Sequence, residues 1–195
     1  IDIYDGLTNP SMPAGTQSAS DNGQQADSRD VSVAPIRSYN GLGVIYDLQG
    51  NFEQSQIYYR KIITAQPQSF LAYNNLGYSY YLSGDWSNAE KSYRSAISLN
   101  DKYVQAWNNL GLVLARQGKF QQSVLAFSHG MDKAQAYNDV GYLAMVDGKY
   151  EKAEMLLSEA IRLFPRFYET AHKNYEDNQA RWADAREALA NKPIK

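Results

Sequence analysis

Apolar residues divide the chain into two unlike parts. From Ile36 onward, aromatic and aliphatic residues recur three and four positions apart, the spacing of one face of an α-helix. Residues 9–30 are mainly Ser, Gly, Gln, Asn, Asp, Pro and Ala, with no aromatic residue. Such a segment buries too little apolar surface to offset the entropy of ordering it. We therefore expect a flexible polar N-terminal tether over 1–34 and an all-α domain over 35–191.

The helical part repeats itself. Two sets of glycines recur at spacings of 34, 34 and 30 residues: Gly43, Gly77, Gly111 and Gly141, and Gly50, Gly84, Gly118 and Gly148. An aromatic residue follows each member of the second set by two positions: Phe52, Trp86, Phe120 and Tyr150. This pattern resembles the tetratricopeptide repeat (TPR), a helix-turn-helix unit with a period of about 34 residues. The resemblance implies an α-solenoid of four units at about 36–69, 70–103, 104–133 and 134–167.

The two glycine sets have different expected roles. The first follows a pair of core residues in the first helix of each unit, where the lack of a side chain lets the second helix cross closely. Small residues of the second helix are expected opposite these glycines: Ser55, Ala89, Ser123 and Ala153. The second set ends the first helix in the left-handed conformation that glycine adopts without steric cost.

The third unit is four residues short. Phe127 to Tyr137 spans 10 residues, whereas Tyr59 to Tyr73 spans 14. We expect the end of a second helix to be missing near Gly130, with a tighter corner and a local change of superhelical pitch.

The last helical run, 167–190, lacks the Leu-Gly pair and is expected to be a capping helix over the open end of the stack. Its expected inner face contains Tyr168, Ala171, Tyr175, Trp182, Ala185 and Leu189.

Composition and charge exclude several classes of function. The chain has 19 Lys and Arg against 21 Asp and Glu, without the basic excess of a nucleic-acid or anionic-membrane binder. It has no cysteine, and its two histidines, His129 and His172, belong to no catalytic or metal-binding motif. Glu151 and Glu154 fit a solvated helix face. No apolar run reaches the length of a membrane span. We therefore expect a protein-binding scaffold that is not an enzyme and uses no cofactor, metal, nucleic acid or transmembrane segment.

The first helices are expected to line a concave peptide-binding groove. Their register places on it Arg37, Asn40, Val44 and Asp47; Leu71, Asn74, Tyr78 and Tyr81; Gln105, Asn108, Leu112 and Ala115; and Gln135, Asn138, Tyr142 and Met145. The asparagines recur as a ladder whose carboxamides could pair with the backbone of an extended peptide. The apolar members form a stripe typical of an interface. Two alternatives remain open: the asparagines bond local backbone, and a neighbouring helix covers part of the stripe.

The groove lacks a basic clamp. TPR domains that bind acidic chaperone tails use Lys and Arg at groove positions, where this chain has Asn40, Val44, Asn75, Gln105 and Asn109. A chaperone-tail ligand is therefore disfavoured.

Residues 133–174 show a narrower resemblance. They are similar to the end of the TadD family, the TPR lipoproteins of tight-adherence (Flp) pilus systems. The resemblance is carried by Ala136, Tyr137, Asn138, Gly141, Tyr142, Pro165, Ala171 and Asn174. It implies a periplasmic protein held at the outer membrane by a lipid anchor upstream of Ile1, which helps a secretin or another pilus component assemble or localise. The sequence itself contains no lipid-accepting cysteine. The alternatives are a periplasmic adaptor for exopolysaccharide export or cell-wall maintenance, and a regulatory domain of a larger enzyme.

Overall fold

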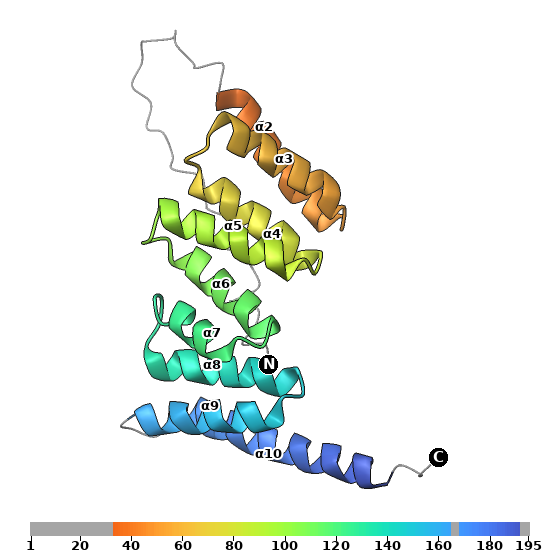
Figure 1. The fold of residues 1–195 in the computed structure, drawn as a ribbon, viewed down its shortest axis with the longest axis vertical. Coiled ribbons are helices and arrows are strands. Elements are labelled where there is room, and N and C mark those ends of the chain that lie inside the picture. The colour runs from red at the N-terminus through yellow and green to blue at the C-terminus, as the bar shows by residue number, and fades with distance from the viewer. Residues whose placement is uncertain (1–32, 165–167, 192–195) are drawn as a thin grey trace, which may run out of the picture.

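The computed structural model describes residues 33–164 and 168–191, and within them all regular structure is α-helical (Figure 1). Four helical hairpins follow one another: α2 (Val33–Leu48) and α3 (Phe52–Ala65), α4 (Phe70–Leu82) and α5 (Trp86–Leu99), α6 (Val104–Arg116) and α7 (Phe120–Phe127), and α8 (Lys133–Val146) and α9 (Tyr150–Leu163). A single helix, α10 (Glu169–Ala190), ends the stack. The predicted all-α solenoid of four hairpins and a terminal helix is confirmed. The tether predicted over 1–34 lies outside the described residues, except that its last two residues begin α2.

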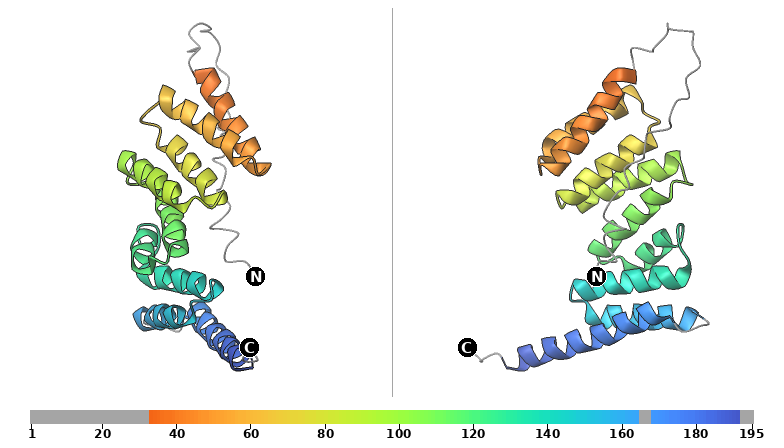
Figure 2. Two further views of the ribbon diagram at one scale, coloured as in Figure 1. Left: turned by 45° about the vertical axis from the view of Figure 1, so that its right-hand side comes forward. Right: turned by 180° about the vertical axis from the view of Figure 1, so that it is seen from behind.

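The hairpins stack in chain order. Each second helix packs on the first helix of the next hairpin, and the first helices also contact one another along the stack. The left view of Figure 2 shows α4 and α8 on one side and α5 and α9 on the other, so first and second helices form two layers. Each hairpin therefore contributes side chains of its first helix to one continuous wall along the stack.

Glycine shapes every hairpin turn as predicted. Gly50, Gly84, Gly118 and Gly148 all have φ between 70° and 79°, the left-handed region in which other residues are strained. The residue after the glycine caps the second helix in the first two hairpins. The side chains of Asn51 and Asp85 accept hydrogen bonds from the backbone N–H groups of Gln54 and Asn88.

The other glycine set allows close helix crossing, although its partner is larger than predicted. A Cβ atom on Gly77 would lie 2.8 Å from the ring of Tyr93, which is 1% exposed. The same relation joins Gly43 to Tyr59, Gly111 to Phe127 and Gly141 to Leu157. The small residues expected at this contact are buried beside it, and Ser123 donates a hydrogen bond of 2.7 Å to the Gly111 carbonyl. The missing side chain therefore accommodates a large side chain of the second helix.

The short third unit ends in a turn that folds back on its own first helix. Helix α7 has 8 residues, whereas α3, α5 and α9 have 14. A Cβ atom on Gly130 would lie 2.3 Å from Cγ1 of Val104, so only glycine fits where the turn crosses α6. The exposed His129 ring stacks on Trp107 with centroids 3.5 Å apart. In Figure 1 the helices slope above this turn and lie nearly level below it, which agrees with the expected change of pitch.

Helix α10 covers the end of the stack with only part of its length. Ala171, Asn174 and Asn178 are buried, and α10 contacts both α8 and α9. Its C-terminal half extends past α9 (Figures 1 and 2). Leu189, predicted for the inner face, is 65% exposed because no described helix reaches that far. Glu154, predicted to face solvent, instead accepts hydrogen bonds from Tyr175 at 3.2 Å and Gln179 at 2.5 Å of α10.

Candidate protein-binding wall

The residues predicted to line the groove differ in how far they reach the surface. Four are exposed: Arg37, Asn40, Leu71 and Gln135. Seven are half-buried: Val44, Asp47, Tyr78, Tyr81, Gln105, Asn108 and Tyr142. Five are buried: Asn74, Leu112, Ala115, Asn138 and Met145. The last five therefore do not belong to an open surface, and the contacts of each group explain why.

The predicted asparagine ladder is a hydrogen-bonded chain between first helices. Asn75 Nδ2 donates to Asn40 Oδ1 at 2.9 Å, which joins α4 to α2. Asn109 Nδ2 donates to Asn74 Oδ1 at 3.0 Å, which joins α6 to α4. Asn74 also donates to Asn75 at 3.4 Å, and Gln105 donates to Asn109 at 3.2 Å. Both ends of the Asn74 carboxamide are thus used inside the protein, so its placement on a peptide-binding surface was wrong.

The same type of contact holds α10 on α8. Asn174 Nδ2 donates to Asn138 Oδ1 at 2.9 Å, and Asn138 Nδ2 donates to Asp139 Oδ1 at 3.1 Å. Asn138 is 1% exposed. Its prediction as a groove residue was wrong for the same reason. The sequence signal for this role is the polar residue beside each ladder position, Asn75, Asn109 and Asp139, which makes pairing between helices possible.

The chain of asparagines is interrupted between α6 and α8. Asp139 occupies the position of the donors Asn75 and Asn109, and a carboxylate has no proton to donate. Burial raises the pKa of Asp139 to about 6, the hydrogen bond from Asn138 lowers it, and the nearby Asp132 raises it further. Asn108 Oδ1 is buried without a hydrogen-bond partner and lies 3.1 Å from the position of a Cβ on Gly130. Asn108 therefore sits under the short turn, with its oxygen away from the open wall.

The three buried apolar residues belong to the core between α6 and α8. Leu112, Ala115 and Met145 are 3%, 2% and 1% exposed and share a core cluster with Val140 and Leu143, so the placement of Ala115 in the groove was also wrong. Tyr81 and Tyr142 pack against this cluster and remain half-buried. Leu112 and Met145 were therefore wrongly assigned to the groove surface. The alternative that neighbouring helices cover part of the stripe is correct for these two positions.

Sequence reasoning missed one exposed apolar residue in three of the first helices. Leu48, Leu82 and Val146 are 78%, 39% and 48% exposed. Each lies four residues after a predicted stripe position, so it continues the same helix face. The four positions of this row repeat at the spacing of the glycines: Leu48, Leu82, Arg116 and Val146. In α6, Arg116 forms an ion pair of 2.5 Å with Asp147, the residue that follows α8.

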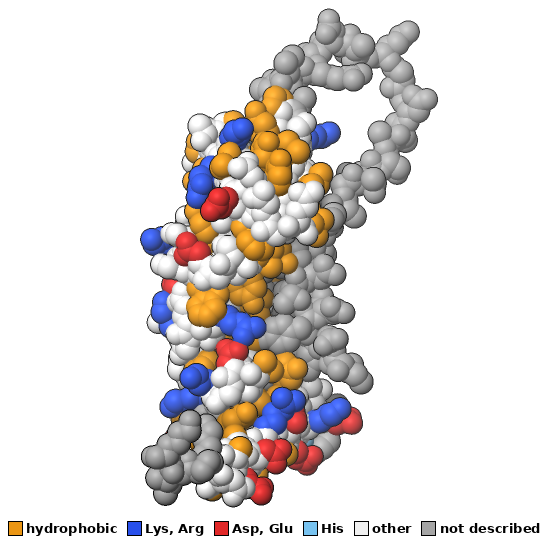
Figure 3. Space-filling view, turned by 90° about the vertical axis from the view of Figure 1, so that its right-hand side faces the viewer, with side chains coloured by type: hydrophobic (Ala, Val, Ile, Leu, Met, Phe, Trp, Pro, Cys, Tyr) orange, Lys and Arg blue, Asp and Glu red, His pale blue; other side chains and the backbone are white. Residues whose placement is uncertain are grey.

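We define the inner wall as the accessible part of this first-helix face. It contains Arg37, Asn40, Val44, Leu48, Leu71, Tyr78, Tyr81, Leu82, Gln105, Gln135, Tyr142 and Val146. On the face seen in Figure 3, hydrophobic side chains form a broken band along the stack, with charged side chains mainly along one margin and at the α10 end. The polar members of the inner wall are Arg37, Asn40, Gln105 and Gln135, which lie toward the N-terminal ends of the first helices, and its other members are apolar or aromatic.

One tyrosine of the wall, Tyr78, has a raised pKa. Burial raises the pKa of Tyr78, and the charge of Asp47 and the nearby Tyr81 raise it further. Asp47 itself accepts a hydrogen bond from Tyr59 at 2.9 Å, while burial raises its own pKa. Protonated tyrosines present an apolar ring and a hydroxyl that both donates and accepts hydrogen bonds, which suits contact with another polypeptide.

The part of the chain that the structure describes contains neither a candidate metal site nor a candidate membrane-spanning helix. Its His, Asp and Glu side chains form no cluster of three or more that could hold a metal ion. Among its helices, none combines the length and apolar character needed to cross a bilayer.

Family models match two parts of the stack. Residues 36–69, the first predicted unit, match the model described as tetratricopeptide repeat, and residues 77–118 match a model described as TPR repeat. Both stretches therefore match tetratricopeptide repeats. No curated protein has a significant sequence match to this chain. TPR solenoids generally bind other proteins along an extended surface, and most are not themselves enzymes.

Solved structures share the TPR fold. A crystal structure of MamA protein aligns with a TM-score of 0.55 and 21% identity over 81% of this chain and 90% of MamA. Pseudomonas aeruginosa PilF aligns with a TM-score of 0.54 and 20% identity over 81% of this chain and 72% of its own. A mutant O-GlcNAc transferase of Thermobaculum terrenum aligns with a TM-score of 0.53 and 18% identity over 70% of this chain and 27% of the transferase. At these identities the likeness concerns the fold.

Proposed function

We propose that this TPR protein is a non-enzymatic scaffold whose inner wall binds an apolar segment of another protein. The observation that carries the proposal is the row formed by Leu48, Leu82 and Val146, which are 39–78% exposed on three of the four first helices. Beside this row lie the half-buried rings of Tyr78 and Tyr142. A group of exposed apolar side chains on one face of a protein usually marks an interaction site.

An amphipathic helix fits this wall better than an extended peptide. An extended ligand needs groups that pair with its backbone, and the carboxamides of Asn74, Asn109 and Asn138 are occupied inside the protein. Packed helices lie about 8–10 Å apart. Exposed apolar residues on neighbouring first helices should therefore recur at roughly that interval along the wall. Two turns of an α-helix advance about 10 Å, so a partner helix with apolar residues seven apart would match successive hairpins.

The cellular role we propose is assistance in assembling or localising a pilus or secretion component, such as an outer-membrane secretin, from the periplasmic side. The resemblance of residues 133–174 to the TadD family supports this role. The polar composition of residues 9–30 supports a tether to a membrane anchor upstream of Ile1. One observation favours a second candidate, a regulatory TPR domain of a larger enzyme: the O-GlcNAc transferase aligns over only 27% of its chain.

Site-specific photo-crosslinking in the native cell tests both levels of the proposal. A photoreactive residue at Leu82 on the inner wall should capture a partner, and the same residue at Leu125 on α7, which is 65% exposed, should not. Mass spectrometry of the adduct identifies the partner. A secretin or pilus protein supports the cellular role, and a soluble enzyme supports the second candidate. Capture at Leu125 without capture at Leu82 contradicts the inner wall as the binding site.

A further inference from the structure

The first hairpin exposes a face that every later hairpin buries. Ile45 of α2 is 49% exposed, whereas its register equivalents Ser79, Val113 and Leu143 are 0–2% exposed. Tyr58 of α3 is half-buried, whereas Ser92, Ala126 and Leu156 are 3–7% exposed. In the later hairpins the preceding second helix covers this face: α3 covers α4, α5 covers α6 and α7 covers α8. We call the uncovered face of α2 and α3 the leading edge.

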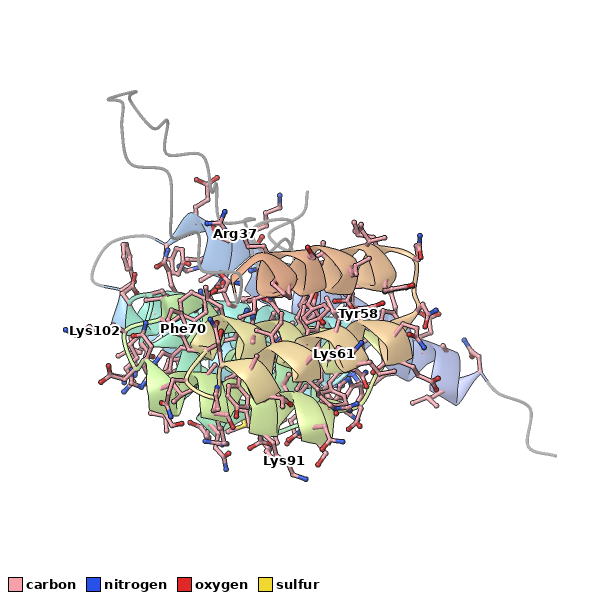
Figure 4. The ribbon with its side chains drawn as sticks, turned by 90° about the horizontal axis from the view of Figure 1, so that it is seen from above. Arg37, Tyr58, Lys61, Phe70, Lys91 and Lys102 are labelled. Atoms are coloured by element: carbon pink, nitrogen blue, oxygen red, sulfur yellow. The ribbon has the colours of Figure 1, made fainter. Side chains whose placement is uncertain are left out.

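The side chains of the leading edge differ in chemistry from those at the equivalent, covered positions of the later hairpins. Tyr58 stacks on Tyr46 with ring centroids 5.6 Å apart and lies 5.9 Å from the ring of Tyr39. Lys61 Nζ lies 4.8 Å from the centre of the Tyr58 ring and 5.4 Å from that of Tyr39. Figure 4, seen from this end of the stack, shows Tyr58 and Lys61 together on α3. The edge therefore combines an aromatic surface with an exposed positive charge.

We propose that residues 1–7 of the chain cover the leading edge as an intramolecular cap. This segment, IDIYDGL, holds Ile1, Ile3, Tyr4 and Leu7, the one cluster of large apolar residues before the first hairpin. Its spacing of three and four residues matches one face of a helical turn. Its charged residues are Asp2 and Asp5, opposite in sign to Lys61 of the edge. The cap would supply the apolar cover that a preceding second helix gives to each later hairpin.

The connecting chain is long enough. Residues 8–32 join the segment to the start of α2, and a flexible linker of about 25 residues has an end-to-end distance of roughly 25–30 Å. From Val33 to Ile45, α2 advances by about 18 Å. The apolar segment can thus reach the middle of the edge, and tethering keeps its local concentration near the millimolar range or above.

Cysteine pairing tests the contact directly, because residues 1–195 contain no cysteine. The test variant combines Leu7→Cys with Ile45→Cys on the edge. Its control combines Leu7→Cys with Val146→Cys on the inner wall, since Ile45 and Val146 are 49% and 48% exposed. Under mild oxidation of the dilute monomer, the edge pair should form its disulfide about tenfold faster than the control pair. Equal rates, or faster closure to Val146, overturn the proposal.

Hydrogen exchange of the cysteine-free chain gives an independent readout. Ile3→Asp combined with Tyr4→Ser should speed amide exchange in α2 and α3 several-fold, because the cap is lost. Exchange in α8 and α9 should not change and serves as the internal control. Unchanged exchange in α2 and α3 would show that residues 1–7 do not cover the leading edge. Binding of a partner at the inner wall is scored separately, so failure of the cap leaves the proposed function untouched.

Discussion

Replacing Asp139 by Asn should stabilise the protein at neutral pH. Asp139 stands where α4 and α6 carry Asn75 and Asn109, each of which donates to an asparagine of the preceding first helix. Asparagine keeps a side-chain oxygen that accepts from Asn138 and carries no charge. The substitution therefore removes a buried charge.

The structure sets the size and the pH dependence of the effect. Burial raises the pKa of Asp139 from its ordinary 3.8 to about 6 in the folded protein. A raised pKa means that the folded state holds its proton more tightly, so stability is highest at low pH and falls as pH rises through about 6. A shift of about two pKa units corresponds to about 3 kcal/mol of free energy of unfolding above pH 7.

Urea denaturation of wild type and Asp139→Asn at pH 4 and pH 7.5 measures this effect. The variant should exceed wild type by about 2–4 kcal/mol at pH 7.5, and the difference should largely vanish at pH 4. Asp184→Asn on the exposed face of α10 is the matched control and should leave the difference between the two pH values as in wild type. Equal stability of wild type and Asp139→Asn at pH 7.5 would refute the reasoning.

Four further substitutions test the packing. Gly77→Ala should destabilise by about 1–3 kcal/mol because its Cβ would meet the Tyr93 ring, whereas Gly41→Ala in open space should stabilise by about 0.5–1 kcal/mol; thermal melts separate the two. Asn109→Ala should cost about 1–3 kcal/mol in urea titrations by leaving Asn74 Oδ1 buried and unpaired, and a neutral effect would deny the asparagine chain. Glu154→Ala should raise amide exchange in α10 but not in α4; unchanged α10 exchange would show that the bonds from Tyr175 and Gln179 do not hold the cap.

The repeating glycines made the hairpins predictable from the sequence. A residue in the left-handed region, such as Gly84, and a close helix crossing, such as that at Gly77, each demand glycine for a local steric reason. The spacing of these glycines therefore predicts where each hairpin lies in the sequence. The shortened α7 was predictable on the same grounds, because four missing residues had to be removed between two fixed positions.

The accessibility of the wall was not predictable from helix register alone. Register says that Asn74 and Leu112 face the same side as Tyr78, but burial depends on the first helix of the neighbouring unit, about 34 residues away in the chain. Asn74 is covered because Asn109 bonds to it across that gap. Leu112 is covered because the core between α6 and α8 includes it. Leu48 and Val146 remain exposed because they lie at the ends of their helices, where no neighbouring first helix covers them.

Calorimetric titration of the partner segment identified by crosslinking tests the central claim most directly. The inner-wall variant combines Leu82→Glu and Val146→Glu, and the matched control combines Leu125→Glu and Met155→Glu on second helices, where the two residues are 65% and 59% exposed. Circular dichroism verifies that both variants keep their helices. The inner-wall variant should lose about 2 kcal/mol or more of binding free energy, roughly 30-fold in Kd, and the control should bind like wild type. Normal binding by the inner-wall variant together with lost binding by the control would place the partner on the second-helix layer and contradict the account.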